Sequence, residues 1–311
     1  MRAIKYFFGL FFILITASSC VVDDDFYRDG PNPGITLDEL LNTYSIWYVD
    51  YDRTEGPDNI PFLSKAFTIS FQNGRLYANN NLVGIGQTGN GLGVQIGYYD
   101  AYGETLEVFH DLDGRYDFYV DQLANNRIRL VSKNYDVSYY LIGYHRSDFD
   151  YNRLFYDNIE YFLQEYRAWE KTYTSQLGAL NEFDNENFLR FTPENLTTFY
   201  SSQDPVGTDI DLIQWDYEGN YEVFDVQGYD DLKILRLDYD FFNDNEEFEL
   251  TVINDSTISL YHVESGTTYH FQGRQFIPFL RENNSNAREI KKERERFKVE
   301  RKMKTRKSSE K

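Results

Sequence analysis

The sequence has a single cysteine, Cys20, so no disulfide can form within the chain. Basic residues are also scarce: 31 Lys and Arg stand against 51 Asp and Glu, and a net charge of −20 excludes the usual electrostatic binding of nucleic acid. Hydrophobic residues nevertheless make up 41% of the chain and aromatic residues 18%, which is too apolar for a disordered protein. The 311 residues are enough for two domains with additional segments at the ends.

The only long apolar run lies close to the N-terminus. It covers Tyr6–Ala17 and follows a basic start with Arg2 and Lys5. As a helix it would be about 18 Å long, too short for a hydrocarbon core of about 30 Å but typical of a signal peptide. Ala17-Ser18-Ser19-Cys20 follows directly and resembles the lipobox of bacterial lipoproteins. This resemblance implies that residues 1–19 are a signal peptide, cleaved before a Cys20 that carries acyl chains such as palmitate.

An acidic run, Asp23–Asp25, follows the cysteine closely. It resembles the surface-export signal of Bacteroidota lipoproteins, which implies a lipid anchor in the cell outer membrane with the protein on the outer face. The periplasmic face is the alternative, with residues 20–36 serving only as an acidic linker.

The body of the chain alternates short aromatic and β-branched segments with Asn, Asp and Gly turns, which predicts antiparallel β structure. Two segments, Leu37–Tyr51 and Asp157–Gln176, are expected to be helical, the second because apolar residues recur at helical spacing. We therefore predict a mainly β fold of two antiparallel barrels or meanders, each preceded by a helix, at 37–150 and 151–281. The pattern resembles lipocalin-like domains of uncharacterised Bacteroidota and flavobacterial outer-membrane lipoproteins.

The two halves also share a sequence pattern. Trp47 corresponds to Trp169, and the window 118–143 aligns without gaps to 248–273. Five identities occur in that window, and they include Gly143 with Gly273. We expect an internal duplication, the alternative being that any two aromatic hairpins look alike.

Enzyme signatures are weak. Some similar lipoproteins are associated with nicotinic acid mononucleotide adenylyltransferase activity, which needs an H-x-G-H-type signature, but none of the four histidines has a second histidine three residues later. There is no G-x-S-x-G motif. His262 and His270 flank Ser265-Gly266; a two-residue turn there would point them to opposite faces, so they should not share a metal. We therefore predict no catalytic residues, no metal site, no cofactor and no enzyme activity.

A glycine-rich segment is the most distinctive internal motif. Its spacing fits G-x-G-x-x-G, but a strand pattern follows where a dinucleotide site needs a helix. The glycines allow either positive φ angles at a barrel rim or a ligand-contacting loop. The candidate ligand residues are Gly84, Gly86, Gly89, Gly91, Gly93, Tyr98 and Tyr99.

Residues 282–311 form a basic charged tail, with 12 Lys and Arg against 6 Asp and Glu. We expect it to be a solvated helix or disordered, and either inert or in contact with anionic lipid headgroups or the acidic body of a neighbour.

Together these features predict a non-catalytic cell-envelope lipoprotein that binds a small apolar or sugar ligand in its barrel mouths. The first alternative is a structural or assembly subunit of an outer-membrane complex with envelope protein partners. The second is a hydrolase or transferase whose site the sequence does not reveal.

Overall fold

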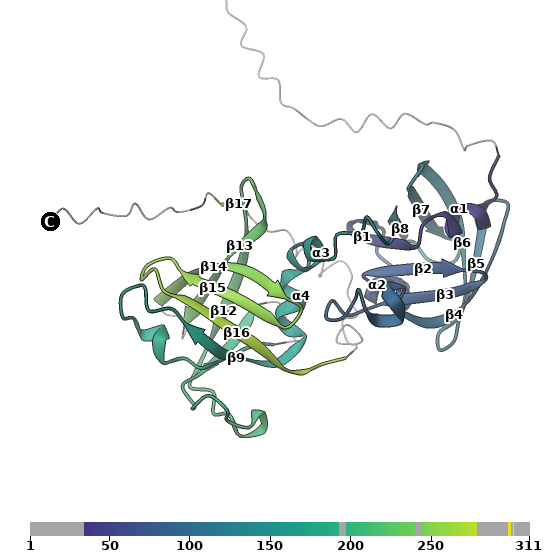
Figure 1. Cartoon of the computed structure of the whole chain (residues 1–311). Helices are drawn as coiled ribbons and strands as arrows, with labels where there is room; N and C mark the ends of the chain where they lie inside the picture. Colours follow the sequence, from purple (N-terminus) through teal and green to yellow (C-terminus); the bar gives the residue numbers. More distant parts are fainter. Residues whose placement is uncertain (1–33, 193–196, 240–243, 279–297, 300, 302–311) are drawn as a thin grey trace, which may run out of the picture.

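The computed structural model describes residues 34–192, 197–239, 244–278, 298–299 and 301 (Figure 1). Cys20, the predicted signal peptide, most of the acidic linker and most of the basic tail lie outside the described residues, so the predictions made for them stay predictions. No helix in the described part of the chain is long and apolar enough to cross a membrane.

The first half forms a closed antiparallel barrel of eight strands joined in sequence order. Its strands are β1 Ile46–Glu55, β2 Thr68–Gln72, β3 Arg75–Asn79, β4 Val94–Tyr102, β5 Thr105–His110, β6 Gly114–Ala124, β7 Arg127–Ser132 and β8 Ser138–Tyr144. Pairing of β1 with β8 closes the barrel. Asn73 and Gly74 both have positive φ and form the predicted two-residue turn between β2 and β3.

The second half repeats this arrangement. Its strands are β9 Tyr166–Thr174, β10 Phe188–Phe191, β11 Thr198–Ser202, β12 Tyr217–Val226, β13 Tyr229–Tyr239, β14 Asp244–Asn254, β15 Thr257–His262 and β16 Thr268–Phe276. Pairing of β9 with β16 and of β11 with β12 closes this barrel. A two-residue strand, β17 (Lys298–Val299), adds to β12 from outside. The predicted fold class, two antiparallel barrels each following a helical region, is confirmed.

Short helices close the ends of the first barrel. Helix α1 (Leu37–Thr43) begins at a capping box formed by Thr36 and Glu39, and buries its leucines against the end where β1 starts. Helix α2 (Pro61–Lys65) lies at the opposite end, where Phe62 and Leu63 are buried. The barrel is therefore covered at both ends by apolar side chains.

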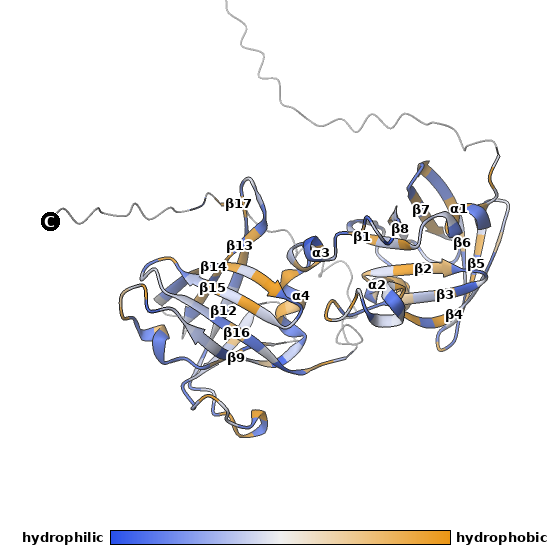
Figure 2. Ribbon diagram, in the orientation of Figure 1, coloured by the Kyte–Doolittle hydropathy of each residue, from blue (hydrophilic) through white to orange (hydrophobic). Residues whose placement is uncertain are grey.

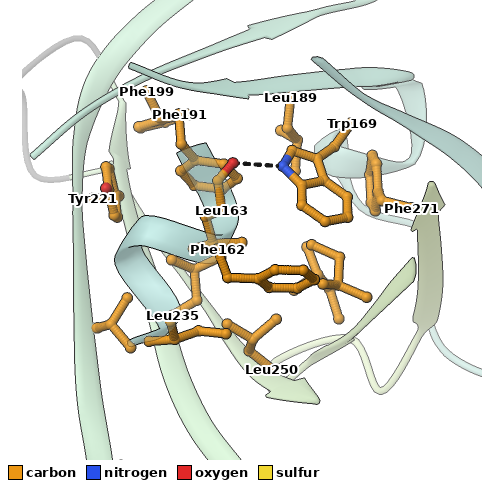
Figure 3. Packing of buried hydrophobic residues seen from close by; sticks show 14 of the residues in the cluster. Phe162, Leu163, Trp169, Leu189, Phe191, Phe199, Tyr221, Leu235, Leu250 and Phe271 are labelled. Carbon is orange, nitrogen blue, oxygen red and sulfur yellow. Dashed lines mark hydrogen bonds between the residues drawn. The ribbon is translucent and has the colours of Figure 1, made fainter. Parts of the chain in front are cut away.

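The second barrel is covered in the same way. Helix α3 (Tyr151–Asp157) connects the halves, and α4 (Ile159–Gln164) precedes β9 as α1 precedes β1. The 3₁₀ turn η2 (Glu182–Asn185) takes the place of α2 and buries Phe183. Figure 3 shows Phe162 and Leu163 of α4 directed into the barrel among apolar side chains from the surrounding strands. Two further 3₁₀ turns are η1 (Thr88–Gly91) and η3 (Ile210–Leu212).

Equivalent side chains occupy equivalent places in the two barrels. Trp47 Nε1 donates to the carbonyl of Leu41 at 3.0 Å, and Trp169 Nε1 donates to Leu163 at 2.7 Å. Each tryptophan pairs across the barrel seam with a glycine, Gly143 or Gly273. The sequence offset of 130 residues also holds for whole strands, because β6 with β14 and β7 with β15 begin and end 130 residues apart. The predicted internal repeat is confirmed as a structural repeat.

Two predictions of local structure were wrong. The expected helices Leu37–Tyr51 and Asp157–Gln176 end at Thr43 and Gln164, and their remainders are strands β1 and β9. Burial alternates along much of β1 but not along β9, where Ala168, Trp169, Glu170 and Lys171 are all buried. In both remainders the seam pairing outweighs helix propensity. The turn at Ser265-Gly266 is also longer than two residues, since His262 bonds to Thr267 and Tyr261 pairs with Thr268.

Both barrel interiors are filled with side chains. Large residues at most 2% exposed include Trp47, Phe71, Phe118 and Tyr139 in the first barrel. Along many strands buried apolar residues alternate with more exposed polar ones, and Figure 2 shows hydrophobic and hydrophilic bands along the strands. Packing of this kind is that of a small barrel whose interior is a core, which leaves the rims and the space between the barrels for a ligand.

Candidate functional site

The glycine-rich segment connects β3 to β4 at the α2 end of the first barrel. Gly84, Gly89, Gly91 and Gly93 all have φ between +55° and +101°, so four of the five glycines take the left-handed conformation. A Cβ at Gly93 would meet the carbonyl oxygen of Ala78 at 2.2 Å. The expectation of positive φ angles at a barrel rim is therefore confirmed.

Between and before these glycines, the loop carries two apolar residues that pack against the second barrel. Leu82 is fully buried and Ile85 is 2% exposed, and both belong to the core cluster that contains Leu154 and Phe155 of α3. This packing places the glycine-rich loop at the junction of the two barrels.

A buried carboxylate strengthens the same junction. Glu165, directly after α4, accepts hydrogen bonds from the backbone N–H groups of Leu82 at 2.6 Å and Val83 at 2.7 Å. Its backbone carbonyl accepts from Ile277, at the end of the second barrel. Charged acceptors make strong bonds to backbone N–H groups, so Glu165 fixes the loop on the second barrel.

The two tyrosines of the candidate ligand set lie apart from the loop. Tyr98 is 53% exposed on the outer face of β4. Tyr99 points inward, where its hydroxyl accepts from Asn42 at 2.7 Å and donates to Asp38 at 3.0 Å, at the α1 end of the barrel. The structure thus does not bring Tyr98 and Tyr99 together with the glycines, and the proposed contact of these seven residues with a ligand stays a prediction.

A cavity of about 650 Å³ lies between the barrels. Its walls come from β1, β8, the segment leading into α3, α3 itself, and strands β12 and β13. The lining residues are Tyr48, Asp50, Tyr51, Asp52, Ile142, Tyr144, Asp148, Phe149, Asp150, Arg153, Leu154, Asp157, Asn158, Asp225 and Lys233. We call this cavity the inter-barrel cleft.

The inter-barrel cleft is strongly acidic. Six aspartates line it against one arginine and one lysine. Both basic groups have carboxylate partners: Lys233 forms an ion pair with Asp225, and Arg153 lies 3.5 Å from Asp157. Burial raises the pKa of the Asp50 carboxyl, and the neighbouring Asp52 raises it further. Such a cleft repels anions and favours ligands that carry hydrogen-bond donors or positive charge.

Aromatic rings form the apolar part of the cleft. Tyr144 and Phe149 meet edge to face with ring centroids 5.2 Å apart, and Phe149 in turn contacts Tyr151 at 4.8 Å. Tyr48 and Phe149 are half-buried against the core cluster of the second barrel. The cleft therefore combines aromatic rings with carboxylate acceptors, which can contact both the apolar faces and the hydrogen-bond donors of a polar ligand.

A second cavity of about 440 Å³ lies at the α2 end of the first barrel. It is lined by α2 with the rims of β3 and β4 and the β5–β6 turn, and includes Phe62, Val94, Ile96 and Leu112. Leu112 is 91% exposed. This cavity is a mouth pocket of the kind expected for an apolar ligand, and we call it the α2 pocket.

His262 and His270 lie apart, as expected, although the turn between their strands is longer than the predicted two residues. His262 is buried and contacts Glu246 and Ser265, whereas His270 lies on the outer face with its ring tilted against that of Tyr173. Among the described residues there is no group of three or more His, Cys, Asp or Glu side chains placed to hold a metal ion.

Sequence reasoning missed the inter-barrel cleft. Its aspartates come from β1, the segment before α3, α3 itself and β12, so neither spacing nor composition marks them as one site. Comparison with protein-family models gave no match, and comparison with curated proteins gave none either.

Proposed function

We propose that this chain is a lipid-anchored, non-catalytic envelope protein that binds a sugar-like ligand in the inter-barrel cleft. The observation that carries the proposal is the cleft itself, a cavity of about 650 Å³ with aromatic rings and six aspartates, beside two barrels with filled interiors. Carboxylates accept charge-assisted hydrogen bonds from hydroxyl and ammonium groups, and rings cover the apolar faces of a sugar. The ligand class is therefore a neutral or amino sugar, and acidic sugars are excluded by repulsion.

The anchor belongs to the same proposal. Cys20 would hold the chain in the outer membrane through its acyl chains, with the surface-exposed face favoured by the acidic residues that follow it. The linker before Thr36 would then carry the two barrels and the cleft away from the bilayer.

Titration calorimetry tests the cleft. The probes are a glucosamine trimer, its N-acetylated form, a galacturonate trimer and palmitate. We expect the first two to bind and the galacturonate trimer not to bind.

The double variant Asp52→Asn, Asp148→Asn should weaken binding of the glucosamine trimer at least tenfold, whereas Asp100→Asn, on the outer face of β4, should leave it unchanged. Palmitate binding that survives in the double variant would instead favour the α2 pocket.

An assembly role is the second candidate, and one surface favours it. Exposed aromatic residues gather on the outer face of β4–β6, where Tyr98 pairs with Phe109 and Thr105 lies between Tyr102 and Tyr119. Exposed apolar patches of this kind often mark protein contacts. If no probe binds and residues of this face crosslink to neighbouring envelope proteins, the assembly role is supported.

A further inference from the structure

The second barrel has an edge that its own strands do not fill. Strand β11 pairs with β12 only along Tyr217–Asn220, although β12 continues to Val226. Near the end of β12, β17 pairs with it in parallel, with Lys298 opposite Asp225 and Val299 opposite Val226. Gln227 N–H also donates to the carbonyl of Val299 at 3.0 Å. An open strand edge is a template for strand addition, and here the tail of the chain occupies it.

Side chains on the outer surface add to this backbone pairing. Phe224, Val226, Leu232 and Ile234 form an apolar cluster that is separate from the barrel interior, and Val299 packs against it. All four are less than 9% exposed. The edge is therefore accompanied by an apolar patch that suits one aliphatic side chain.

An ion pair fixes the register two residues further along the tail. Both nitrogens of Arg301, Nε and Nη2, lie 2.6 Å from the two oxygens of Glu249, and the guanidinium lies 5.3 Å from the centre of the Tyr229 ring. Glu249 raises the pKa of Arg301 further. Bidentate pairs of this kind are geometrically selective, so the edge recognises an aliphatic residue followed two positions later by arginine.

We propose that this edge of β12 is a docking site for the tail of a second copy, so that copies of the chain link by exchanging tails. Within one copy the tail is held by two backbone-paired residues, the contact of Val299 with the apolar cluster and the contacts of Arg301 with Glu249 and Tyr229, a small contact area that can exchange. The 19 residues between 278 and 298 can span up to about 60 Å, enough to reach a neighbour. Charge supports the exchange, because residues 282–311 are basic while the whole chain is strongly acidic.

The test uses the full chain with Cys20→Ser, which leaves no native cysteine. The acceptor copy carries Val226→Cys with Arg301→Glu, so that its own tail binds weakly. The donor copy carries Val299→Cys with Glu249→Arg, so that its tail leaves its own edge. After mixing under mild oxidation, we expect a disulfide-linked heterodimer on non-reducing gels, with a yield that rises with protein concentration.

The controls separate exchange from random contact. When the donor also carries Arg301→Glu, the heterodimer yield should fall at least tenfold. A single chain with both Val226→Cys and Val299→Cys reports pairing within one copy. An intramolecular disulfide in that chain without heterodimer in the mixture would overturn tail exchange. The absence of both disulfides would overturn the docking site itself. Neither result bears on the sugar-binding proposal.

Discussion

At the level of single residues, one glycine in each barrel allows the seam to close. A Cβ at Gly143 would lie 2.5 Å from the ring of Tyr44, and one at Gly273 would lie 2.4 Å from the ring of Tyr166. Each of these tyrosines also contacts the tryptophan three residues later, with ring centroids 5.2 and 5.0 Å apart. The aromatic ring thus lies over a backbone position where only glycine fits.

Replacing these glycines should destabilise the protein. Gly143→Ala and Gly273→Ala force the Tyr44 or Tyr166 ring to move and should each lower the free energy of unfolding by about 1–3 kcal/mol. Gly86→Ala is the matched control, because its Cβ would lie at an ordinary 3.6 Å from Tyr151. Urea unfolding measures the stability of all three variants. If Gly273→Ala leaves the free energy of unfolding unchanged, the seam tolerates a side chain at that position.

A buried carboxyl makes the second barrel sensitive to pH. Burial raises the pKa of Glu186 to about 7, although the Tyr239 hydroxyl donates to this carboxyl at 2.8 Å. Between its ordinary pKa of 4.5 and about 7, the folded chain keeps a proton that the unfolded chain has released. Stability should therefore fall as pH rises through this window, by roughly 3 kcal/mol.

The Glu186→Gln variant isolates this effect. Glutamine keeps a hydrogen-bond acceptor but cannot ionise. The unfolding free energy of the variant should therefore fall less between pH 5 and pH 8 than that of the unmodified protein. Urea titrations at both pH values make the comparison. Parallel declines in the two proteins would place the pH sensitivity elsewhere.

At the level of elements, the sequence predicted strands better than helix ends. The 130-residue offset, read from identities such as Gly143 with Gly273, places β14 and β15 correctly because repeated side-chain patterns reflect repeated pairing. The second helix was predicted too long because Trp169 continues the helical spacing of the apolar residues of α4, and the first was likewise extended past Trp47 into β1. Their indole N–H groups bond back to those helices, so helix and strand share one apolar surface.

The glycine-rich loop of the first barrel packs against the second barrel and helps to hold the junction. Glu165→Ala would leave two backbone N–H groups of the loop, at Leu82 and Val83, without their carboxylate acceptor. We expect the barrels to stay folded but the junction to loosen, which limited proteolysis would detect as faster cleavage within residues 80–93. Glu264→Ala, at an exposed position, is the control. Equal cleavage of the two variants would show that Leu82 and Ile85 hold the junction alone.

At the level of the whole molecule, the two barrels act as a pair. Each has a filled interior, and the larger of the two cavities is built from both of them. This is why the candidate site could not be predicted from sequence: Asp50 and Lys233, 183 positions apart, reach the cleft only because the loop and α3 fix how the barrels meet. The expected binding within barrel mouths stays a prediction, and the α2 pocket is a cavity of that kind.

We propose that the ligand lies between the barrels and not inside them. Hydrogen–deuterium exchange with mass spectrometry, in the presence and absence of the glucosamine trimer, tests it most directly. We predict protection in peptides that cover residues 48–52, 142–158 and 225–233, with little change in the strands around Phe118 and Phe248. Protection confined to residues 61–66 and 94–113 would contradict a ligand site in the inter-barrel cleft. The absence of protection in every peptide would contradict it as well.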